Sequence, residues 1–401
     1  MKITRKLLGI TCVLTLLAAT AAYAQNVKLG VLTDLGGPFA DSSGTGAVEA
    51  TKMAAEDLKA QLGTRQVEVI SADHQNKPDV GAAIARRWLD TEHVDAIVNV
   101  PNSAIALAVQ TITREHKKIF LITGGATALL TGKQCSPYSA HWTDDTYSLS
   151  TGTTRAMMAR GGAQTWFMVT ADYAAGHALS AAARQVIVAN GGKVLGEALH
   201  PFGTDDQTSF LLQAQSSGAK MIALANAGTD TINSIKQAHE FHIGQPSQTI
   251  VAMALFISDV HSLGLEAAQG LYLTAGFYWD RNDATRTWSH RYFARTGRMP
   301  TREQAETYSA VRHYLRGVIA ENTTNSDKVM AWMKANPVDD FYAPGARLRE
   351  DGRLLHPIYL LQVKTPAESK YPWDYYKVMA TVPPEQAFRP LAEGGCPFVK
   401  P

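Results

Sequence analysis

The chain has 401 residues, of which 45% are hydrophobic and 18% are charged, and its formal net charge at pH 7 is +2. A nearly neutral chain gives no electrostatic reason to expect nucleic acid or an anionic membrane surface as a partner. The length exceeds what one hydrophobic core usually serves, so we expect two domains of ordinary size.

Residues 1–24 have the pattern of an export signal. Lys2, Arg5 and Lys6 form a basic start, an apolar run follows from Leu7 to Ala19, and the small-residue site Ala22-Tyr23-Ala24 ends the segment. We expect cleavage after Ala24 and a mature protein in the periplasm. Beyond this segment, no stretch approaches the roughly 18 to 20 uncharged apolar residues that span a bilayer.

Short apolar runs alternate with amphipathic stretches from Val27 onward. A first series of predicted strands covers Val27–Thr33, Gln66–Ser71, Asp95–Val100 and Lys118–Ile122, with helical patterns such as Thr45–Leu62 and Pro78–Asp90 between them. A second series covers Thr165–Thr170, Lys193–Ala198, Lys220–Ala225 and Thr249–Met253, with a helix over Thr229–His242. This alternation predicts two similar α/β domains, each with a parallel sheet covered on both faces.

The segments after the second series are too few to build a third domain around a sheet. They comprise a strand over Gly270–Ala275, helices over Asp283–Thr296, Arg302–Ala320 and Asp327–Ala335, and a strand over His356–Val363. We expect them to complete the first two domains, so that the chain crosses between the domains more than once. The predicted lobes are 25–142 with 276–345 and 143–275 with 346–365, and a proline-rich and aromatic-rich tail over 366–401 wraps the surface.

The chain has three cysteines. Cys12 lies in the apolar run of the predicted export signal, and we expect it to be removed with the signal, which leaves Cys135 and Cys396. In an oxidising compartment we expect these two to form a disulfide. The alternative is a pair of unrelated buried thiols.

Motifs for catalysis, nucleotides or metals are weak. Gly44-Thr45-Gly46 follows the first strand, but Glu49 stands where a dinucleotide fingerprint needs glycine, and no Gly-x-Ser-x-Gly elbow or Walker-type loop is present. His239 and His242 lie three apart at a helix end without a third ligand at a convincing spacing. Asp144-Asp145 is typical of a helix N-terminal cap rather than of a catalytic carboxylate pair. The sequence predicts no catalytic residue, no metal and no cofactor.

Three turns after strands of the first series are rich in glycine and small polar residues, at 36–44, 101–104 and 123–127. In open α/β sheets, ligands bind beyond the carboxyl ends of the strands, where helix N-termini present free N–H groups. Such turns offer N–H and O–H donors without positive charge, which suits a carboxylate. Ordinary helix capping explains any single turn equally well, but three on one domain favour a ligand site.

The segment 28–34 with Gly37-Pro38-Phe39, the turn Gly125-Ala126-Thr127 and the segment 172–176 resemble the type I periplasmic binding proteins of the leucine/isoleucine/valine-binding class. The resemblance covers about residues 27 to 365. It implies an α/β fold with two Rossmann-like lobes, each with a parallel-type central sheet, joined by a three-crossing hinge. It also implies closure of the lobes on a small-molecule solute, which passes to the membrane permease of an ABC importer. We expect a monomer.

The resemblance carries several residues over to the ligand site. Asn102 and Ser103 match the hydroxyl-bearing turn that holds the ligand carboxylate in this family, and Ala126 and Thr127 match its second carboxylate contact. Tyr173 matches the tyrosine of the second lobe that closes over the ligand.

Further positions are expected at the cleft wall. Ser42 falls where family members often place an aromatic residue, and Tyr308 lies in a segment that resembles a helix bordering the cleft. Phe39, Trp142 and Phe256 are aromatic candidates for the pocket, although each alone is more often a core residue.

Two departures from the family pattern bear on the solute. Amino-acid binders of this class carry an acidic residue in the loop after the strand at Thr249–Met253, where this chain is apolar through Phe256. The tyrosine expected after Lys220–Ala225 is replaced by a segment with Asn226 and Asp230, and Asp230 either pairs with a ligand ammonium or caps the next helix. Burying an ammonium without a partner costs several kcal/mol, so we expect a small organic acid, aromatic or branched, or an amide-bearing solute. A deaminated acid is then expected to bind more tightly than the matching α-amino acid.

The sequence favours an exported, non-catalytic solute-binding protein of an ABC importer. A ligand-binding subunit read by a membrane sensor would use the same fold and the same residues. A secreted enzyme would need a nucleophile-base or metal constellation, which the motifs do not supply.

Overall fold

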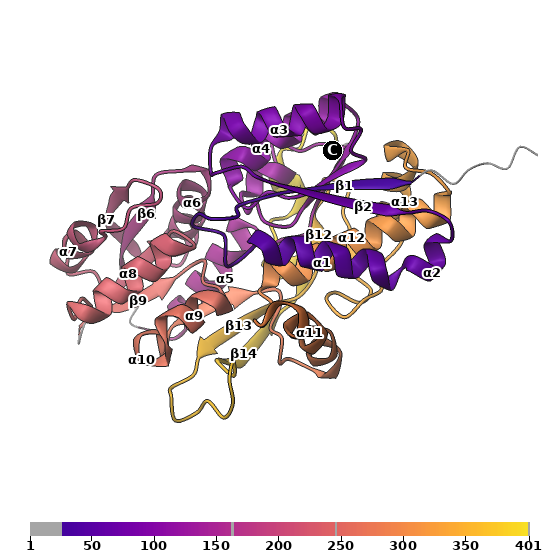
Figure 1. Cartoon of the computed structure of the whole chain (residues 1–401). Helices are drawn as coiled ribbons and strands as arrows, with labels where there is room; N and C mark the ends of the chain where they lie inside the picture. Colours follow the sequence, from indigo (N-terminus) through magenta and orange to yellow (C-terminus); the bar gives the residue numbers. More distant parts are fainter. Residues whose placement is uncertain (1–25, 162–163, 245–246, 400–401) are drawn as a thin grey trace, which may run out of the picture.

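The computed structural model describes residues 26–161, 164–244 and 247–399. The predicted export signal and its cleavage site lie outside this part of the chain. Two parallel sheets form the centres of two lobes, and an antiparallel sheet lies beside the second one (Figure 1). Within the described ranges, no helix is long and apolar enough to cross a membrane.

The first lobe is built on a five-stranded parallel sheet in the order β2-β1-β3-β4-β5. Its strands are β1 (Val27–Thr33), β2 (Val67–Asp73), β3 (Ala96–Asn99), β4 (Ile119–Ile122) and β5 (Ser139–His141). The connecting helices are α1 (Gly44–Asp57), α2 (Lys59–Leu62), α3 (Pro78–Asp90), α4 (Ser103–Glu115) and the 3-10 turn η1 (Ala128–Thr131). Every residue of β3 and β4 is buried, as expected of central strands covered on both faces.

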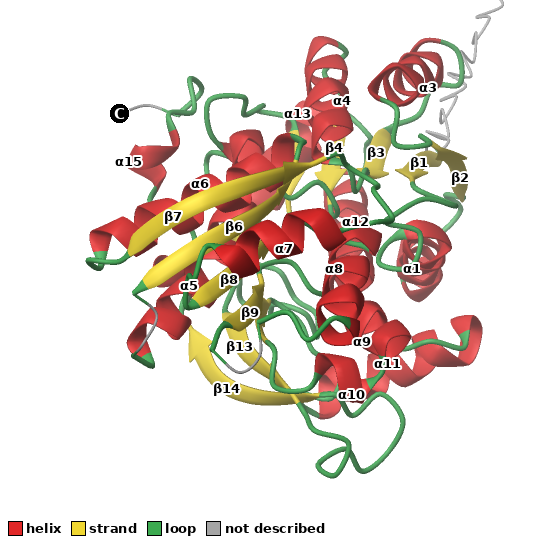
Figure 2. Ribbon diagram, turned by 90° about the vertical axis from the view of Figure 1, so that its left-hand side faces the viewer, coloured by secondary structure: helices red, strands yellow, loops and turns green. Residues whose placement is uncertain are grey.

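The second lobe has a four-stranded parallel sheet in the order β7-β6-β8-β9 (Figure 2). Its strands are β6 (Thr165–Ala171), β7 (Lys193–His200), β8 (Met221–Ala225) and β9 (Thr249–Ala252). Its helices are α5 (Thr146–Ala159), α6 (Ala174–Ala189), α7 (Thr208–Ser216), α8 (Thr229–Glu240), α9 (Ile257–Leu263) and α10 (Leu265–Ala268). Both predicted series of strands are therefore confirmed.

The later segments complete these lobes. Helices α11 (Asp283–Thr296), α12 (Arg302–Glu321) and α13 (Ser326–Ala335) return to the first lobe, where α12 packs on α1. Strands β10 (Tyr272–Ala275), β13 (Ile358–Val363) and β14 (Tyr376–Val382) form the antiparallel sheet beside the second lobe (Figure 2). The chain thus crosses between the lobes three times, as the family resemblance implies.

The predicted boundary at residue 345 is followed by a segment that contacts the first lobe before the third crossing. A hairpin of β11 (Arg347–Leu348) and β12 (Leu354–Leu355) follows α13. The N–H of His141 donates to the carbonyl of Gly352 at 2.7 Å, which attaches this hairpin to β5 of the first lobe. The lobe boundaries stay as predictions.

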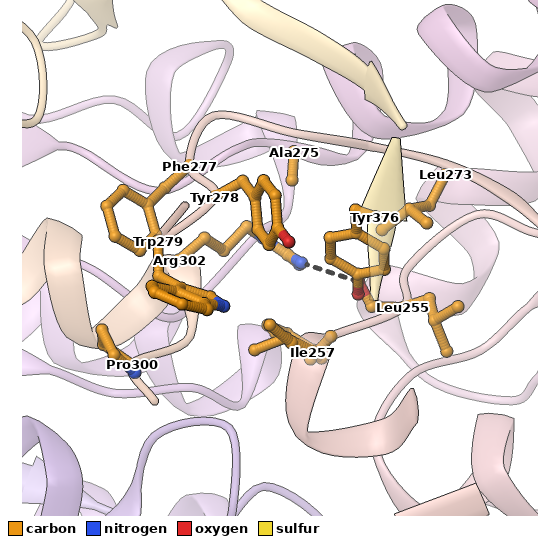
Figure 3. Close-up of a pocket in the computed structure, with 11 residues that line it drawn as sticks. Leu255, Ile257, Leu273, Ala275, Phe277, Tyr278, Trp279, Pro300, Arg302 and Tyr376 are labelled. Carbon is orange, nitrogen blue, oxygen red and sulfur yellow. Dashed lines mark hydrogen bonds between the residues drawn. The ribbon is translucent and has the colours of Figure 1, made fainter. Parts of the chain in front are cut away.

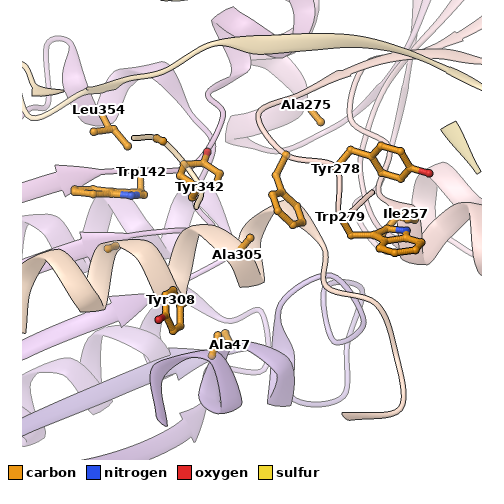
Figure 4. Close-up of a cluster of buried hydrophobic side chains, with 14 of the residues drawn as sticks. Ala47, Trp142, Ile257, Ala275, Tyr278, Trp279, Ala305, Tyr308, Tyr342 and Leu354 are labelled. Atoms are coloured by element: carbon orange, nitrogen blue, oxygen red, sulfur yellow. The ribbon is translucent and has the colours of Figure 1, made fainter. Parts of the chain in front are cut away.

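The largest hydrophobic core runs through the hinge. It joins Ala47 and Tyr308 of the first lobe to Trp279 on the second crossing and to Trp142 and Tyr342 beside the crossings (Figure 4). Because one apolar cluster spans both lobes, the hinge is a packed region rather than a set of free linkers.

The tail, which the sequence predicted to wrap the surface, contains regular secondary structure. Residues 376–382 form β14, and the short helices α14 (Pro384–Ala387) and α15 (Leu391–Gly394) follow. The predicted disulfide is confirmed, since Cys135 and Cys396 are bonded with 5.6 Å between their Cα atoms. The bond fastens the end of the tail to the first lobe.

Candidate functional site

A cavity of about 20 Å³ lies where the two lobes meet. The first lobe contributes the turns after β1, β3 and β4 together with the start of α12, and the second contributes α5, α6 and the turns after β8 and β9. The lining residues are Phe39, Pro101, Ser103, Gly124, Ala126, Thr146, Leu149, Tyr173, Ala175, Leu179, Ala227, Ala254, Phe256, Arg302 and Glu303. The space is that of about one water molecule, so a larger solute enters only when the lobes separate.

Four helix N-termini converge on this cavity. Helix α4 begins at Ser103, α5 at Thr146 and α12 at Arg302, and Ala175 lies in the first turn of α6. Among the residues that the structure describes, no side chain caps the N-terminus of α6, which leaves its first N–H groups available to a ligand. The positive ends of the helix dipoles therefore favour an anionic group in the cavity.

Two hydroxyl groups in the lining are already oriented by the backbone. The Oγ of Ser103 accepts from the N–H of Thr127 at 3.1 Å, and the Oγ1 of Thr146 accepts from the N–H of Ala128 at 3.1 Å. Each hydroxyl keeps its own hydrogen for a further acceptor. The geometry suits a carboxylate oxygen placed between the lobes.

Arg302 brings a positive charge that the sequence analysis did not place in the cleft. Its guanidinium lies 3.8 Å from the centre of the Phe256 ring and donates to the carbonyl of Leu255 at 3.3 Å (Figure 3). Its Nε lies 3.4 Å from Oδ2 of Asp144. On its other side is a smaller apolar cavity of about 10 Å³, whose walls include Tyr278 and Trp279 (Figure 3).

Glu303 is the second charged residue of the lining and is 3% exposed. Its Oε2 has no hydrogen-bond partner among the described residues. Burial raises the pKa of this carboxyl to about 8, against the lowering effect of Arg302. A cation or a hydrogen-bond donor beside it would remove this cost.

A loop of the first lobe, whose conformation is fixed by hydrogen bonds to Asp34, contacts the second lobe. The carboxylate of Asp34 accepts from the N–H groups of Gly37 at 2.7 Å and Phe39 at 2.9 Å. Phe39 then packs into the core of the second lobe, with its ring 5.7 Å from that of Phe202. Phe202 in turn lies 4.6 Å from Tyr173, whose phenol pKa is raised by burial, so that the hydroxyl stays protonated.

Gly228 is expected to be required for closure. Its φ is 63°, and a Cβ built on it would lie 2.3 Å from the carbonyl oxygen of Pro38 in the other lobe. Gly228→Ala should weaken solute binding at least tenfold, because the added methyl keeps the lobes apart. Gly218→Ala is the matched control, since φ is 68° there and a Cβ would meet nothing. Equal affinities of the two variants in calorimetric titrations would contradict this role.

Of the residues predicted from the sequence, Ser103, Ala126, Tyr173 and Phe256 line the cavity, together with Phe39. Asn102 lies beside it but caps α4, its Oδ1 accepting from the N–H groups of two following residues. Thr127 caps η1 in the same way. The hydroxyl of Ser42 donates to the carbonyl of Phe39 at 3.3 Å and lies outside the lining. Capping, the alternative considered for these turns, accounts for the side chains of Asn102 and Thr127.

The other four predicted positions lie outside this lining, and their part in solute binding stays a prediction. Trp142 is fully buried, and its indole N–H donates to Ser309 at 3.0 Å. Asn226 is bonded within its lobe to His200 and Ser234, and the carboxylate of Asp230 accepts from the N–H of Gly203. The hydroxyl of Tyr308 donates to Asp57 at 2.5 Å on the far side of α12.

The sequence reasoning missed Arg302 and Glu303. The signal was present in Thr301-Arg302-Glu303-Gln304, a capping box in which Thr301 accepts from the N–H of Gln304 and Gln304 accepts from that of Thr301. A capping box predicts where α12 begins. Only the fold shows that this helix begins at the cleft.

Comparison with known proteins now identifies the family. The family model for periplasmic binding proteins matches residues 26–370. The chain belongs to this family. A periplasmic binding protein from Burkholderia mallei is 48% identical, with a TM-score of 0.91, and the match covers 94% of this chain and 99% of that one. The resemblance seen in the sequence is thus confirmed.

Two further relatives give the class within the family. A branched chain amino acid ABC transporter periplasmic ligand-binding protein from Burkholderia xenovorans is 39% identical, with a TM-score of 0.82, and the match covers 93% of this chain and 100% of that one. A Brucella melitensis protein named Leu/Ile/Val-binding protein homolog 6 is 28% identical over 222 residues, and the chain spans about half (56%) of its length. Members of this family bind substrates and are not enzymes, so this periplasmic binding protein is a substrate-binding protein.

Proposed function

We propose that this periplasmic binding protein captures a small carboxylate-bearing solute between its lobes and delivers it to the permease of an ABC importer. The convergence of four helix N-termini on the interlobe cavity, one of them without a side-chain cap, carries the proposal. The names of the relatives from Burkholderia xenovorans and Brucella support a solute of the branched-chain amino-acid type.

The carboxylate requirement can be tested with matched ligands. Purified protein is titrated with leucine, with its 2-oxo counterpart and with benzoate, and in parallel with the neutral amide of each acid skeleton. A carboxylate should bind at least tenfold more tightly than its amide, because hydrogen bonds to a charged group contribute about 1.5 to 3 kcal/mol. Equal binding of an acid and its amide would place the anion site elsewhere.

Ser103→Ala is expected to weaken the binding of the preferred carboxylate roughly ten- to a hundredfold while the fold stays intact, because it removes a donor from a desolvated anion. Ser139→Ala is the matched control. Ser139 is equally buried, but its hydroxyl has no hydrogen-bond partner among the described residues and lies in β5, away from the lining. Calorimetric titration and thermal unfolding separate affinity from stability. Identical isotherms for the two variants would argue against Ser103 as a carboxylate contact.

Export and partner are tested in the cell. The sequence-based export signal predicts a mature N-terminus at Gln25 in a periplasmic fraction, and light scattering should give the mass of a monomer.

Deletion of the gene should abolish uptake of the labelled solute if the partner is an importer. Normal uptake with a lost transcriptional or chemotactic response would instead support the membrane-sensor alternative.

A further inference from the structure

A second cavity lies in the first lobe, away from the interlobe cavity. Its volume is about 500 Å³, which is within the range of about 300 to 1,000 Å³ typical of small-molecule sites. Its walls come from α1, α2, α11, α12 and the segment after α13, all in the first lobe (Figure 1). None of its lining residues lines the interlobe cavity as well.

The apolar part of this lining is aromatic. The rings of Trp288 and Phe341 are stacked with 4.4 Å between their centroids, and the ring of Tyr308 lies 5.6 Å from that of Phe341. Trp288 and Tyr308 are buried, whereas Phe341 is half-buried, so part of its ring is open to a ligand. Such a wall favours a flat aromatic group, which can stack on Phe341 or meet it edge to face.

The two carboxylates of the lining already have partners. The carboxylate of Asp57 accepts from both terminal nitrogens of Arg291, at 3.0 and 2.6 Å, and from the hydroxyl of Tyr308 at 2.5 Å. Oδ1 of Asp340 accepts from a backbone N–H of its own loop at 2.9 Å. Neither carboxylate forms a hydrogen bond or an ion pair with Arg312, the other arginine of the lining.

Two donors of this lining are left without acceptors. Arg312 is half-buried, and its guanidinium forms no hydrogen bond or ion pair with any residue of 26–161, 164–244 or 247–399. The indole N–H of Trp288 is buried and likewise has no acceptor in this part of the chain. Because an arginine can hold a carboxylate through two parallel N–H···O bonds, these donors favour an anionic ligand.

We propose that this cavity is a second ligand site, which takes a small aromatic carboxylate with its ring against Phe341 and its carboxylate at Arg312. The site does not depend on the proposed function of the interlobe cavity. Because all of its walls belong to one lobe, it should fill equally well whether the lobes are open or closed. The protein would then hold two small molecules at once, one between the lobes and one on the first lobe.

The test uses benzoate as the probe and benzamide as its neutral counterpart. Nuclear magnetic resonance of protein with isotope-labelled tryptophan gives an indole N–H resonance for Trp288, which is assigned through its absence in Trp288→Phe. Benzoate should shift this resonance in a saturable way, since Trp288 lines the cavity. It should bind at least about tenfold more tightly than benzamide, because hydrogen bonds between charged groups are the stronger ones. Equal binding of the two probes, or no saturable shift, would overturn the proposal.

Arg312→Gln removes the unmatched charge and should weaken benzoate binding at least about tenfold. Arg316→Gln is the matched control, because Arg316 lies one turn further along α12, pairs with Asp339 at 3.3 Å and lies outside the lining. It should bind benzoate as the wild type does. Thermal unfolding checks that both variants are folded. Unchanged binding in Arg312→Gln, or an equal loss in Arg316→Gln, would refute the proposal.

Ser103→Ala distinguishes this site from the interlobe cavity. It should leave the benzoate shift of Trp288 unchanged, because Ser103 lines the other cavity. Loss of the shift in this variant would show that benzoate acts from the interlobe cavity, which would rule out the second site and support the proposed function. A wild type that binds carboxylates in calorimetric titrations without any shift of Trp288 would also rule out the second site, and the proposed function would stand.

Discussion

Asp144→Ala is expected to lower the free energy of unfolding by about 3 to 5 kcal/mol, the usual effect of breaking a buried charge pair. Asp144 is fully buried at the first crossing. Its Oδ2 accepts from the N–H of Gly276 at 2.6 Å, on the second crossing, and lies 3.4 Å from Nε of Arg302. The variant would leave a guanidinium without a counter-ion in a dry hinge. Chemical denaturation followed by circular dichroism measures the change.

The control for this prediction is Asp339→Ala. Asp339 lies 3.3 Å from Arg316, but its side chain is 75% exposed, so the loss should stay within about 1 kcal/mol. A second variant tests whether the broken charge pair causes the destabilisation of Asp144→Ala. Replacing Asp144 by leucine together with Arg302 by methionine removes both charges and should recover much of the stability. A double variant as unstable as Asp144→Ala would show that the hydrogen bond to Gly276, rather than the charge pair, holds the crossings together.

Two neighbouring titratable groups are held in their uncharged forms. Burial and the charge of Asp144 raise the pKa of Glu306 well above its usual value, so this carboxyl holds a proton. Its Oε1 accepts from the hydroxyl of Tyr342 at 3.1 Å. Burial lowers the pKa of His356, on the third crossing, to about 3, so that its imidazole is neutral. These two groups therefore add no charge beside the two arginine-aspartate pairs of the hinge.

The fold was predictable because its central strands are short, buried and flanked by helices with clear periodicity. The elements that escaped prediction are those that depend on a partner. Strand β5 is only three residues long and includes a serine and a histidine. Strand β14 is an edge strand with mostly exposed or half-buried side chains, and it forms because β13 offers a free edge.

The site was predictable only where it uses turns directly after strands. Ser103 and Ala126 follow β3 and β4, so the rule that ligands bind at the carboxyl ends of strands places them in the cleft. Trp142 is a core residue outside the lining, and an aromatic side chain in the core cannot be told from one in a pocket in a sequence. Glu303 was missed because the capping box shows only where α12 begins, whereas the placement of that end at the cleft follows from the second crossing, a tertiary feature.

The disulfide is also expected to make a large contribution to the free energy of unfolding. Replacing both Cys135 and Cys396 by serine should lower the free energy of unfolding by about 2 to 5 kcal/mol, because the bond closes a loop of 261 residues in the unfolded chain. The tail keeps other contacts. The guanidinium of Arg389 donates to the carbonyl of Ala128 in the first lobe at 3.0 Å, and that of Arg155 in the second lobe donates to the carbonyl of Gln386 at 3.0 Å.

These contacts predict which part of the structure should become less protected when the disulfide is removed. The tail bridges both lobes, so without the disulfide α14 and α15 should exchange their amide hydrogens faster than the two parallel sheets do. Hydrogen exchange measured with and without reductant tests this, and the double serine variant is the control, since reductant should change only the wild type. Non-reducing peptide mapping must also recover Cys135 linked to Cys396. Free thiols in the exported protein, or a double variant as stable as the wild type, would show that the hydrogen bonds of Arg389 and Arg155 hold the tail by themselves.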